Sequence, residues 1–199
     1  MRAVIICGGN AGEYIKDYIA PDDFIICADS GLDHAEKLGI RPDVVIGDMD
    51  SVKSKNLGDN AIIYPVRKDF TDSELATDFA KEKGADKILM FGMIGDRMDH
   101  TIANITLLKN TENAVIIDEK NEIYLVKGEF SLCGKIGDVV SIVPVFGDIS
   151  GVSTKGLDYP LVNGQIKCGT TLGVSNVMTQ NKCTIVINEG TALVIRSRE

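Results

Sequence analysis

The sequence predicts two domains of different class: an α/β domain with a mostly parallel, Rossmann-like sheet over residues 1–120, and an all-β sandwich domain over residues 121–199. In the first part, short apolar runs alternate with segments of helical period, which is typical of βαβ units. In the second part, β-type runs are separated by Gly and Asn turns, and no helical period is present. The boundary is a change of pattern, because no Pro-rich linker or repeat separates the parts.

The first part contains six apolar runs that we expect to form strands. They cover residues 3–7, 24–28, 44–46, 61–64, 87–91 and 115–118. Short runs of this kind fill strands that are buried on both faces of a parallel sheet.

Helices are expected between these strands. A helix is expected over residues 11–18, and another ends near Leu38 because Gly39 is a good left-handed terminator. Thr71 and Glu74 have the Thr-x-x-Glu spacing of a capping box and begin a helix that ends near residue 83. A last helix is predicted with one apolar face, formed by Met98, Ile102, Ile105 and Leu108.

The second part contains four apolar runs that read as strands, at residues 122–126, 138–145, 183–188 and 191–196. Short strands separated by turns favour an antiparallel sandwich or a barrel-like domain.

Charge and composition exclude several classes of partner. The net charge is −8 and no basic run is present, which argues against a nucleic-acid partner. The five cysteines are scattered and include no Cys-x-x-Cys pair, so we expect a reducing compartment and not a zinc site. The apolar run at residues 3–7 is too short for a signal peptide, and no stretch has the length of a membrane span. We therefore expect a cytoplasmic protein with no membrane partner.

Two carboxylates follow the apolar run at residues 44–46. In an extended chain Asp48 and Asp50 would point the same way, just past the carboxyl end of a strand, where open α/β sheets bind ligands. Two close carboxylates repel each other, and a divalent cation relieves the repulsion. We interpret the pair as a Mg²⁺ site for a nucleotide polyphosphate, the alternative being a solvated acidic turn.

Four polar clusters fall where strands of the first part end or helices begin. They cover residues 29–31, 48–51, 68–72 and 95–100. Together they offer carboxylates, hydroxyls, Lys68 and Arg97, a set that suits phosphoryl transfer, in which positioning and charge stabilisation dominate. No Walker A loop is present. The Gly8-Gly9-Asn10 turn resembles a phosphate-approach turn, and His100 is expected to be structural.

The ordered set of these clusters resembles the thiamine pyrophosphokinase family, and the resemblance continues at residues 156–161 and 173–176. It implies an α/β domain that binds ATP and Mg²⁺, followed by a β-sandwich domain that binds thiamine and forms a homodimer with thiamine between the subunits. It also implies the reaction, in which ATP and thiamine give AMP and thiamine diphosphate.

The resemblance assigns a role to each matching position. The implied metal ligands are Asp48, Asp50 and Asp72, which count as catalytic together with Arg97 and Asp99 at the reacting centre. The implied nucleotide-binding residues are Asp29, Ser51, Lys68, Asp69 and Asp72. The implied thiamine-binding residues are Tyr159, Ser175, Asn176 and Asp99. Some relatives have tryptophan where this chain has Tyr159, and tyrosine can also serve as an aromatic platform.

Two other functions are compatible with parts of the pattern. A metal-dependent nucleotide-sugar transferase would also use Asp-x-Asp after a strand, but it explains neither the cluster at residues 95–100 nor the motifs of the second part. A non-enzymatic sensor of thiamine or nucleotide would have little use for three metal ligands.

Overall fold

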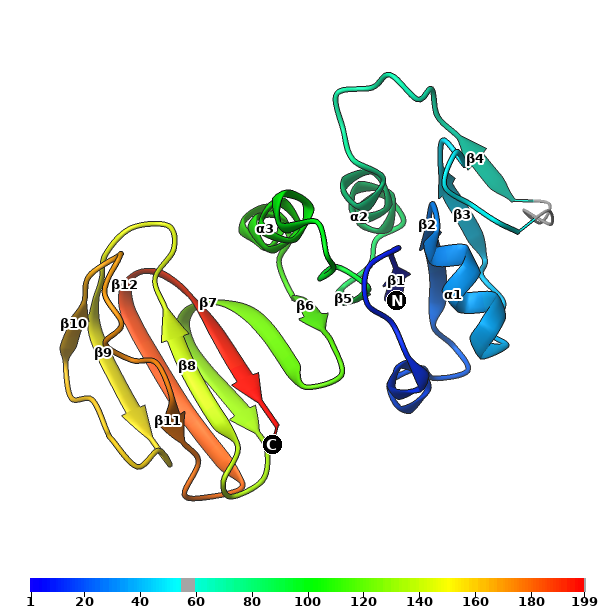
Figure 1. Ribbon diagram of the computed structural model, residues 1–199. Helices are drawn as coiled ribbons and strands as arrows, with labels where there is room; N and C mark the ends of the chain where they lie inside the picture. Colours follow the sequence, from blue (N-terminus) through cyan, green and yellow to red (C-terminus); the bar gives the residue numbers. More distant parts are fainter. Residues whose placement is uncertain (55–59, 199) are drawn as a thin grey trace. The chain divides into compact units, whose positions relative to one another are not determined.

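The computed structural model describes residues 1–54 and 60–198 and divides into two compact units, Met1–Glu119 and Lys120–Glu199 (Figure 1). The first unit combines helices with parallel strands. The second unit contains strands and no helix among its described residues. Each unit is described by itself.

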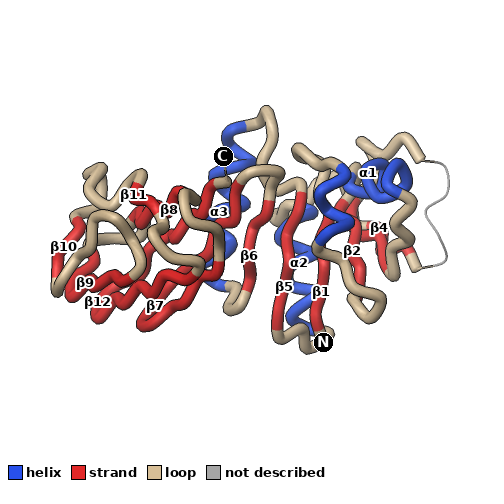
Figure 2. The backbone as a smooth tube through the Cα atoms, turned by 90° about the horizontal axis from the view of Figure 1, so that it is seen from below, coloured by secondary structure: helices blue, strands red, loops and turns tan. Residues whose placement is uncertain are grey.

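The first unit is built on a sheet of six strands (Figure 2). They are β1 Arg2–Ile6, β2 Phe24–Ala28, β3 Val44–Gly47, β4 Ala61–Ile63, β5 Lys87–Phe91 and β6 Ala114–Ile117. Their order is β4-β3-β2-β1-β5-β6, and each neighbouring pair is parallel. Strands β2 to β4 are therefore added on one side of β1, and β5 and β6 are added on its other side, so the strand order reverses between β1 and β5.

Helices cover both faces of this sheet. The helical segments are η1 Glu13–Asp17, α1 Gly31–Leu38, α2 Asp72–Glu82, α3 Met98–Leu107 and η2 Leu108–Asn110. Crossovers between parallel strands are right-handed, so a reversal of strand order places the following helices on the opposite face. Accordingly α1 lies on one side of the sheet, and α2 and α3 lie on the other (Figure 1). Burial on both faces explains why Ile5, Ile26, Ile46 and Phe91 have no exposed surface.

The predicted helix boundaries at Gly39 and Thr71 are confirmed. Gly39 follows α1 with a φ of 68°, the left-handed conformation that glycine adopts without a Cβ penalty. Thr71 caps α2, and its hydroxyl accepts a hydrogen bond from the Glu74 backbone N–H at 3.3 Å. The cap fixes Asp72 as the first residue of α2.

Two helix predictions in this unit are wrong in detail. The helix expected over residues 11–18 is a short 3₁₀ segment, η1, since the Gly-Gly-Asn turn and Gly12 leave little chain before β2. The expected apolar face at α3 is only partly buried: Met98 and Ile102 are 63% and 56% exposed, and Leu108, which begins η2, is buried. Thr101 and Asn104, which were not part of that face, are buried. Periodicity located the helix but not its inward face, because polar side chains with hydrogen-bond partners can also be buried.

The second unit consists of six strands. They are β7 Asn121–Cys133, β8 Val139–Val143, β9 Ile149–Lys155, β10 Gly164–Ile166, β11 Asn176–Val177 and β12 Lys182–Ser197. All pairs among them are antiparallel. The two runs predicted at residues 183–188 and 191–196 form one strand, β12, whose register against β7 shifts between Ile187 and Ala192.

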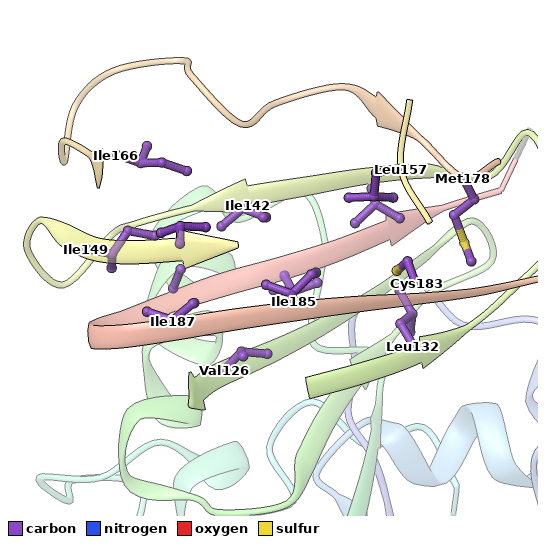
Figure 3. Close-up of a cluster of buried hydrophobic side chains, with 14 residues drawn as sticks. Val126, Leu132, Ile142, Ile149, Leu157, Ile166, Met178, Cys183, Ile185 and Ile187 are labelled. Carbon is purple, nitrogen blue, oxygen red and sulfur yellow. The ribbon is translucent and has the colours of Figure 1, made fainter. Parts of the chain in front are cut away.

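The long strand β12 organises the second unit. Its first half pairs with β7 and β9, and its second half pairs with β7 and β8. The sheet therefore changes partners along β12 and can enclose a core. Buried side chains fill that core, among them Val126, Ile142, Ile149, Ile185 and Met178 (Figure 3).

Among the described residues, none of the helices combines the length and the apolar character that a bilayer crossing demands.

Candidate active site

A cavity of about 490 Å³ lies in the first unit, at the carboxyl ends of its parallel strands. Its lining includes residues that follow β1, β2, β3 and β5, together with the first turn of α2. The cavity adjoins the position between β1 and β5 where the strand order reverses, which is the usual ligand site of an open α/β sheet. The fold thus brings chain segments from four crossovers to one place.

The turn after β1 is joined to the turn after β5. The backbone N–H groups of Gly9 and Asn10 donate to the carbonyls of Gly92 and Ile94, at 2.9 and 2.7 Å. A Cβ at Gly9 would lie 2.4 Å from the Ile94 carbonyl oxygen, so the position has room for glycine alone. These two N–H groups are already used within the protein, and the glycines serve the close approach of two turns. Because Gly8, Gly9 and Asn10 line the cavity, the interpretation of this segment as a phosphate-approach turn stays a prediction.

Asp48 and Asp50 come together in a turn, and the extended geometry expected from the sequence is wrong. The strand β3 ends at Gly47, and Met49 has a φ of 63°. The Asp50 backbone N–H donates to Asp48 Oδ1 at 3.2 Å, which closes the turn. A left-handed residue between the two carboxylates breaks the strand alternation, so their proximity depends on the turn.

Asp29 contributes a third carboxylate to this group. Oxygen atoms of Asp29, Asp48 and Asp50 all lie within 4.8 Å of one another. Asp29 Oδ1 is buried and has no hydrogen-bond partner among the described residues. Burial raises the pKa of Asp29, and the nearby charges of Asp72 and Asp48 add to the effect. An unpaired buried carboxylate oxygen beside two others is a donor set that suits a hard divalent cation.

Lys68 forms ion pairs with two of the predicted metal ligands, Asp48 and Asp72. Its Nζ atom lies 2.8 Å from Asp48 Oδ2 and 3.1 Å from Asp72 Oδ1, and the Lys68 and Asp48 side chains are about nine-tenths buried. The hydrogen bond from Lys68 lowers the pKa of Asp48. Burial lowers the pKa of Lys68, but the two carboxylates outweigh this effect, so its pKa is raised. Lys68 and Asp48 are therefore both charged at neutral pH.

Gly47 allows the three segments to approach. A Cβ at this position would lie 3.1 Å from Asp72 Oδ1 and 3.2 Å from the Asp29 Cα atom. Any larger residue at the end of β3 would push the first turn of α2 away from the turn after β2.

Arg97, which lines the cavity, forms an exposed ion pair with Asp99. Arg97 donates from its terminal nitrogen to Asp99 Oδ2 at 2.6 Å and from Nε to Oδ1 at 3.3 Å. This pair lowers the pKa of Asp99 to about 2, helped by the backbone N–H of His100. Asp99 is thus an ionised hydrogen-bond acceptor and a weak base.

The first unit gathers most of the residues predicted for the nucleotide and the metal. The cavity lining includes Asp29, Ser51, Lys68, Asp72 and Arg97. Three further residues bond directly to members of that lining: Asp48 to Lys68, Asp50 to Ser51 and Asp99 to Arg97. Asp69 is exposed and lies between two residues of the lining, Lys68 and Phe70.

Three of the four residues predicted for thiamine, Tyr159, Ser175 and Asn176, belong to the second unit, whereas Asp99 lies on α3 in the first unit. Asn176 Nδ2 donates to the Tyr159 carbonyl at 2.7 Å, and Asn176 Oδ1 accepts from the Tyr159 backbone N–H at 3.0 Å. Ser175 has a φ of 60°, and its N–H donates to Ser141 Oγ at 3.0 Å. The Tyr159 ring is exposed, at 71% for the whole residue. The amide of Asn176 therefore holds the backbone that carries Tyr159.

Several cavity residues were not singled out from the sequence. Ser73, Thr101 and Asn104 line the cavity and are buried. The sequence does contain a signal for two of them, since Thr101 and Asn104 are three residues apart and so share one face of α3.

The comparisons with known proteins agree with the two units. Residues 15–120 match the model of the thiamin pyrophosphokinase catalytic domain, and residues 122–192 match the model of the thiamin pyrophosphokinase vitamin B1 binding domain. The thiamine pyrophosphokinase of Bacillus subtilis is 31% identical over 214 residues, with 100% of both chains covered.

Solved structures show the same likeness. The crystal structure of the Bacillus subtilis thiamine pyrophosphokinase has a TM-score of 0.91 and 29% identity, and covers 100% of both chains. That of the Geobacillus thermodenitrificans thiamin pyrophosphokinase has a TM-score of 0.89 and 29% identity, and covers 100% of this chain and 98% of the other. With both domain models matched in order and a full-length relative above 30% identity, the chain belongs to the thiamin pyrophosphokinase family.

Proposed function

We propose that this chain transfers the pyrophosphoryl group of ATP to the hydroxyl of thiamine, giving thiamine diphosphate and AMP. Family membership and a full-length curated relative support this activity. The observation that carries the proposal is the cavity at the carboxyl edge of the parallel sheet, where Asp29, Asp72 and Lys68 meet. Such a site offers both charge signs that a metal-bound polyphosphate requires.

We assign residues 1–120, read as a Rossmann-like domain, to ATP, Mg²⁺ and catalysis. Residues 121–199, read as a sandwich domain, are assigned to thiamine binding and dimerisation. The unit boundary at Glu119 and the two matched family models support this division. The free thiols of all five cysteines fit a reducing compartment such as the cytoplasm.

Mg²⁺ is the proposed cofactor, and the residues present fit it. The proposed ligands are Asp48, Asp50 and Asp72. The group of close carboxylate oxygens contains Asp48, Asp50 and, in place of Asp72, Asp29, whose buried Oδ1 atom has no hydrogen-bond partner among the described residues, so we add Asp29 to the proposed ligands. When bound, the ion would stabilise the negative charge that develops on the phosphates as the bond to AMP breaks.

The chain's own cations complement the polyphosphate. Lys68 Nζ, held between Asp48 and Asp72, lies in the cavity lining and is charged at neutral pH. Arg97 also lines the cavity and can neutralise negative charge on the transferring group. Ser51 and Asp69 complete the side that we assign to the nucleotide.

The reaction is an in-line displacement at the β-phosphorus of ATP. A bond forms between the thiamine hydroxyl oxygen and the β-phosphorus, the bond from that phosphorus to the oxygen of AMP breaks with its electron pair staying on AMP, and the hydroxyl proton passes to water. Asp99 is held ionised by Arg97 with a pKa of about 2, so it accepts a hydrogen bond from the hydroxyl and orients it. A loose transition state needs little help from a base.

Thiamine is proposed to bind against the second unit. Tyr159 offers an exposed aromatic face for a heteroaromatic ring. Ser175 and Asn176 are proposed to hydrogen-bond the aminopyrimidine. The side-chain amide of Asn176 is hydrogen-bonded to the backbone of Tyr159, so we propose that Asn176 also holds the aromatic ring of Tyr159 in place.

A homodimer with active sites between subunits is part of the proposal. Exposed apolar side chains support it, since Met98 and Ile102 are 63% and 56% exposed on α3, and Val162 and Leu172 are 85% and 55% exposed in the second unit. Sedimentation of the purified protein tests the dimer independently of catalysis, and a monomer at micromolar concentration would contradict it.

Product analysis tests the function itself. The protein is incubated with ATP, Mg²⁺ and thiamine, and the nucleotide products are separated with and without each component. Thiamine-dependent formation of AMP with equal thiamine diphosphate is expected. Formation of ADP, transfer from a nucleotide sugar, or binding of thiamine without turnover would each overturn the proposal.

A further inference from the structure

We propose that Asn104 is a positioning residue that fixes the first turn of α2, with Asp72, and the loop after β5, with Arg97, to one another. The inference rests on the proposed function, and it concerns a residue to which that function assigns no contact with ATP or thiamine. Asn104 lies on α3, is 6% exposed, and lines the cavity.

The amide of Asn104 bonds two different segments. Its Oδ1 atom accepts from Ser73 Oγ at 2.7 Å, and its Nδ2 atom donates to the Met93 carbonyl at 2.7 Å. Ser73 is the second residue of α2, and Met93 follows β5 by two residues. Asn104 therefore spans from the helix that carries Asp72 to the loop that leads to Arg97.

The number of hydroxyl hydrogens determines which group donates in each hydrogen bond of this network. The single hydroxyl hydrogen of Ser73 goes to Asn104, so in the 3.0 Å contact between Thr71 Oγ1 and Ser73 Oγ the donor is Thr71. Thr71 Oγ1 in turn accepts the Glu74 backbone N–H. A reversed Asn104 amide would set its oxygen against the Met93 carbonyl oxygen, so one orientation is selected.

The two residues that flank Asp72 in the sequence both belong to this hydrogen-bond network. Thr71 and Ser73 are both members, and Asp72 between them pairs with Lys68 and lies against Gly47. The position of Asp72 relative to the Asp48 turn is thus set by hydrogen bonds that come from α3. Buried polar groups in such a network are costly to leave unpaired, which favours a single arrangement.

A second bond pair from α3 holds the other end of the loop. Thr101 Oγ1 accepts from the Gly95 N–H at 3.1 Å and donates to the Gly95 carbonyl at 3.2 Å. Arg97 follows two residues later. Thr101 and Asn104 together tie residues 93–95 to α3, so the polar face of this helix serves the site.

The test compares Asn104→Leu, which keeps the side-chain volume but removes both hydrogen bonds, with Ser73→Ala, which removes only the α2 side. Thr106→Val is the matched control, since Thr106 is an exposed residue of α3 whose hydroxyl donates to the Ala103 carbonyl of its own helix. Each variant is assayed far below its unfolding temperature, with the folded fraction measured by circular dichroism.

We expect Asn104→Leu to lower kcat by tenfold or more, on the order of what a small misplacement of reacting groups costs. The KM for thiamine stays within twofold, because three of the four residues assigned to thiamine, Tyr159, Ser175 and Asn176, belong to the second unit. Ser73→Ala lowers kcat less, and Thr106→Val leaves it unchanged. A kcat loss that only follows the folded fraction, or a kcat within twofold of the parent, would overturn the positioning role.

Hydrogen exchange gives a readout that needs no activity. Asn104→Leu is expected to speed amide exchange in residues 72–76 and in residues 92–96 together, while peptides of β12 stay unchanged. Faster exchange in only one segment, or in neither, contradicts the coupling. A parent protein that forms no AMP would overturn the proposed function, while the exchange result would still decide the role of Asn104.

Discussion

Lys68 Nζ lies 2.8 Å from Asp48 Oδ2, so the chain that enters α2 neutralises the carboxylate at the end of β3. The same ammonium lies 3.1 Å from Asp72 Oδ1. Lys68 thus holds two of the proposed metal ligands together. Its positive charge offsets the repulsion between the carboxylate of Asp48 and that of Asp72 in the first turn of α2.

Replacing Lys68 by methionine should destabilise the fold. The change leaves Asp48 and Asp72 without a countercharge, and we expect a loss of about 1–3 kcal/mol, below the figure for a fully buried pair since Asp72 is a quarter exposed. Urea unfolding measures it. Lys16→Met removes an exposed pair with Glu13 and should cost under about 1 kcal/mol. Equal losses for the two variants would show that the Lys68 bridge is not stabilising.

Arg97 should control both the acidity of Asp99 and the rate. In Arg97→Ala the pKa of Asp99 is expected to rise from about 2 toward the usual value of about 3.9, as seen by carbon NMR of the carboxyl group. Asp99 remains ionised at neutral pH in either case. The expected loss of kcat, about 10²–10³-fold, therefore reports the missing charge on the transferring group. An unchanged Asp99 titration would contradict the ion pair.

Tyr159 should affect thiamine binding more than turnover. Tyr159→Ala removes the exposed aromatic face and is expected to raise the KM for thiamine about tenfold, since stacking and apolar contact of one ring contribute on the order of 1–2 kcal/mol. Tyr159→Phe keeps the face and should stay near the parent. If the alanine variant lowered kcat and left KM unchanged, Tyr159 would have no role as a platform.

The ion pair of Arg2 and Asp23 predicts how stability depends on acid. Burial raises the pKa of Asp23, but the bonds from Arg2, at 2.6 Å to each oxygen, and from the Ala20 N–H outweigh it, so its pKa is lowered. A carboxylate with a lowered folded-state pKa stabilises the fold above its unfolded pKa of about 3.9 and loses that effect as the pH falls through the folded value.

Asp23→Asn should therefore cost about 1–3 kcal/mol at pH 7. The difference from the parent should shrink below pH ~4. Thermal unfolding from pH 7 down to pH 2 measures both. A difference that stays constant over the whole range would mean that the pKa of Asp23 is the same in the folded and unfolded states.

Local signals in the sequence were sufficient for much of the first unit. Apolar runs located its six strands, and Gly39 and Thr71 marked helix ends because their chemistry is fixed by backbone geometry. The acidic turn was a harder case. Asp48 and Asp50 do converge, but through the left-handed Met49, a conformation that a strand pattern does not reveal.

Other features depend on tertiary partners and could not be read locally. The polar face of α3 is buried because Ser73, Met93 and Gly95 accept or donate to it, and these partners come from other elements. In the second unit, β9 was missed since Ser150, Gly151, Ser153 and Thr154 dilute its apolar pattern. Its strand state follows from pairing with β10 and β12.

The measurement that tests the central claim most directly is thiamine-dependent AMP formation by Asp48→Ala, compared with that by Asp22→Ala. Asp22 is an exposed carboxylate that precedes β2 and is not part of the cavity lining. Both proteins are first shown to be folded by circular dichroism. The carboxylate cluster at the end of β3 predicts that Asp48→Ala loses at least about a hundredfold in kcat, while Asp22→Ala matches the parent. Near-normal turnover by folded Asp48→Ala would contradict the metal-nucleotide site at this sheet edge.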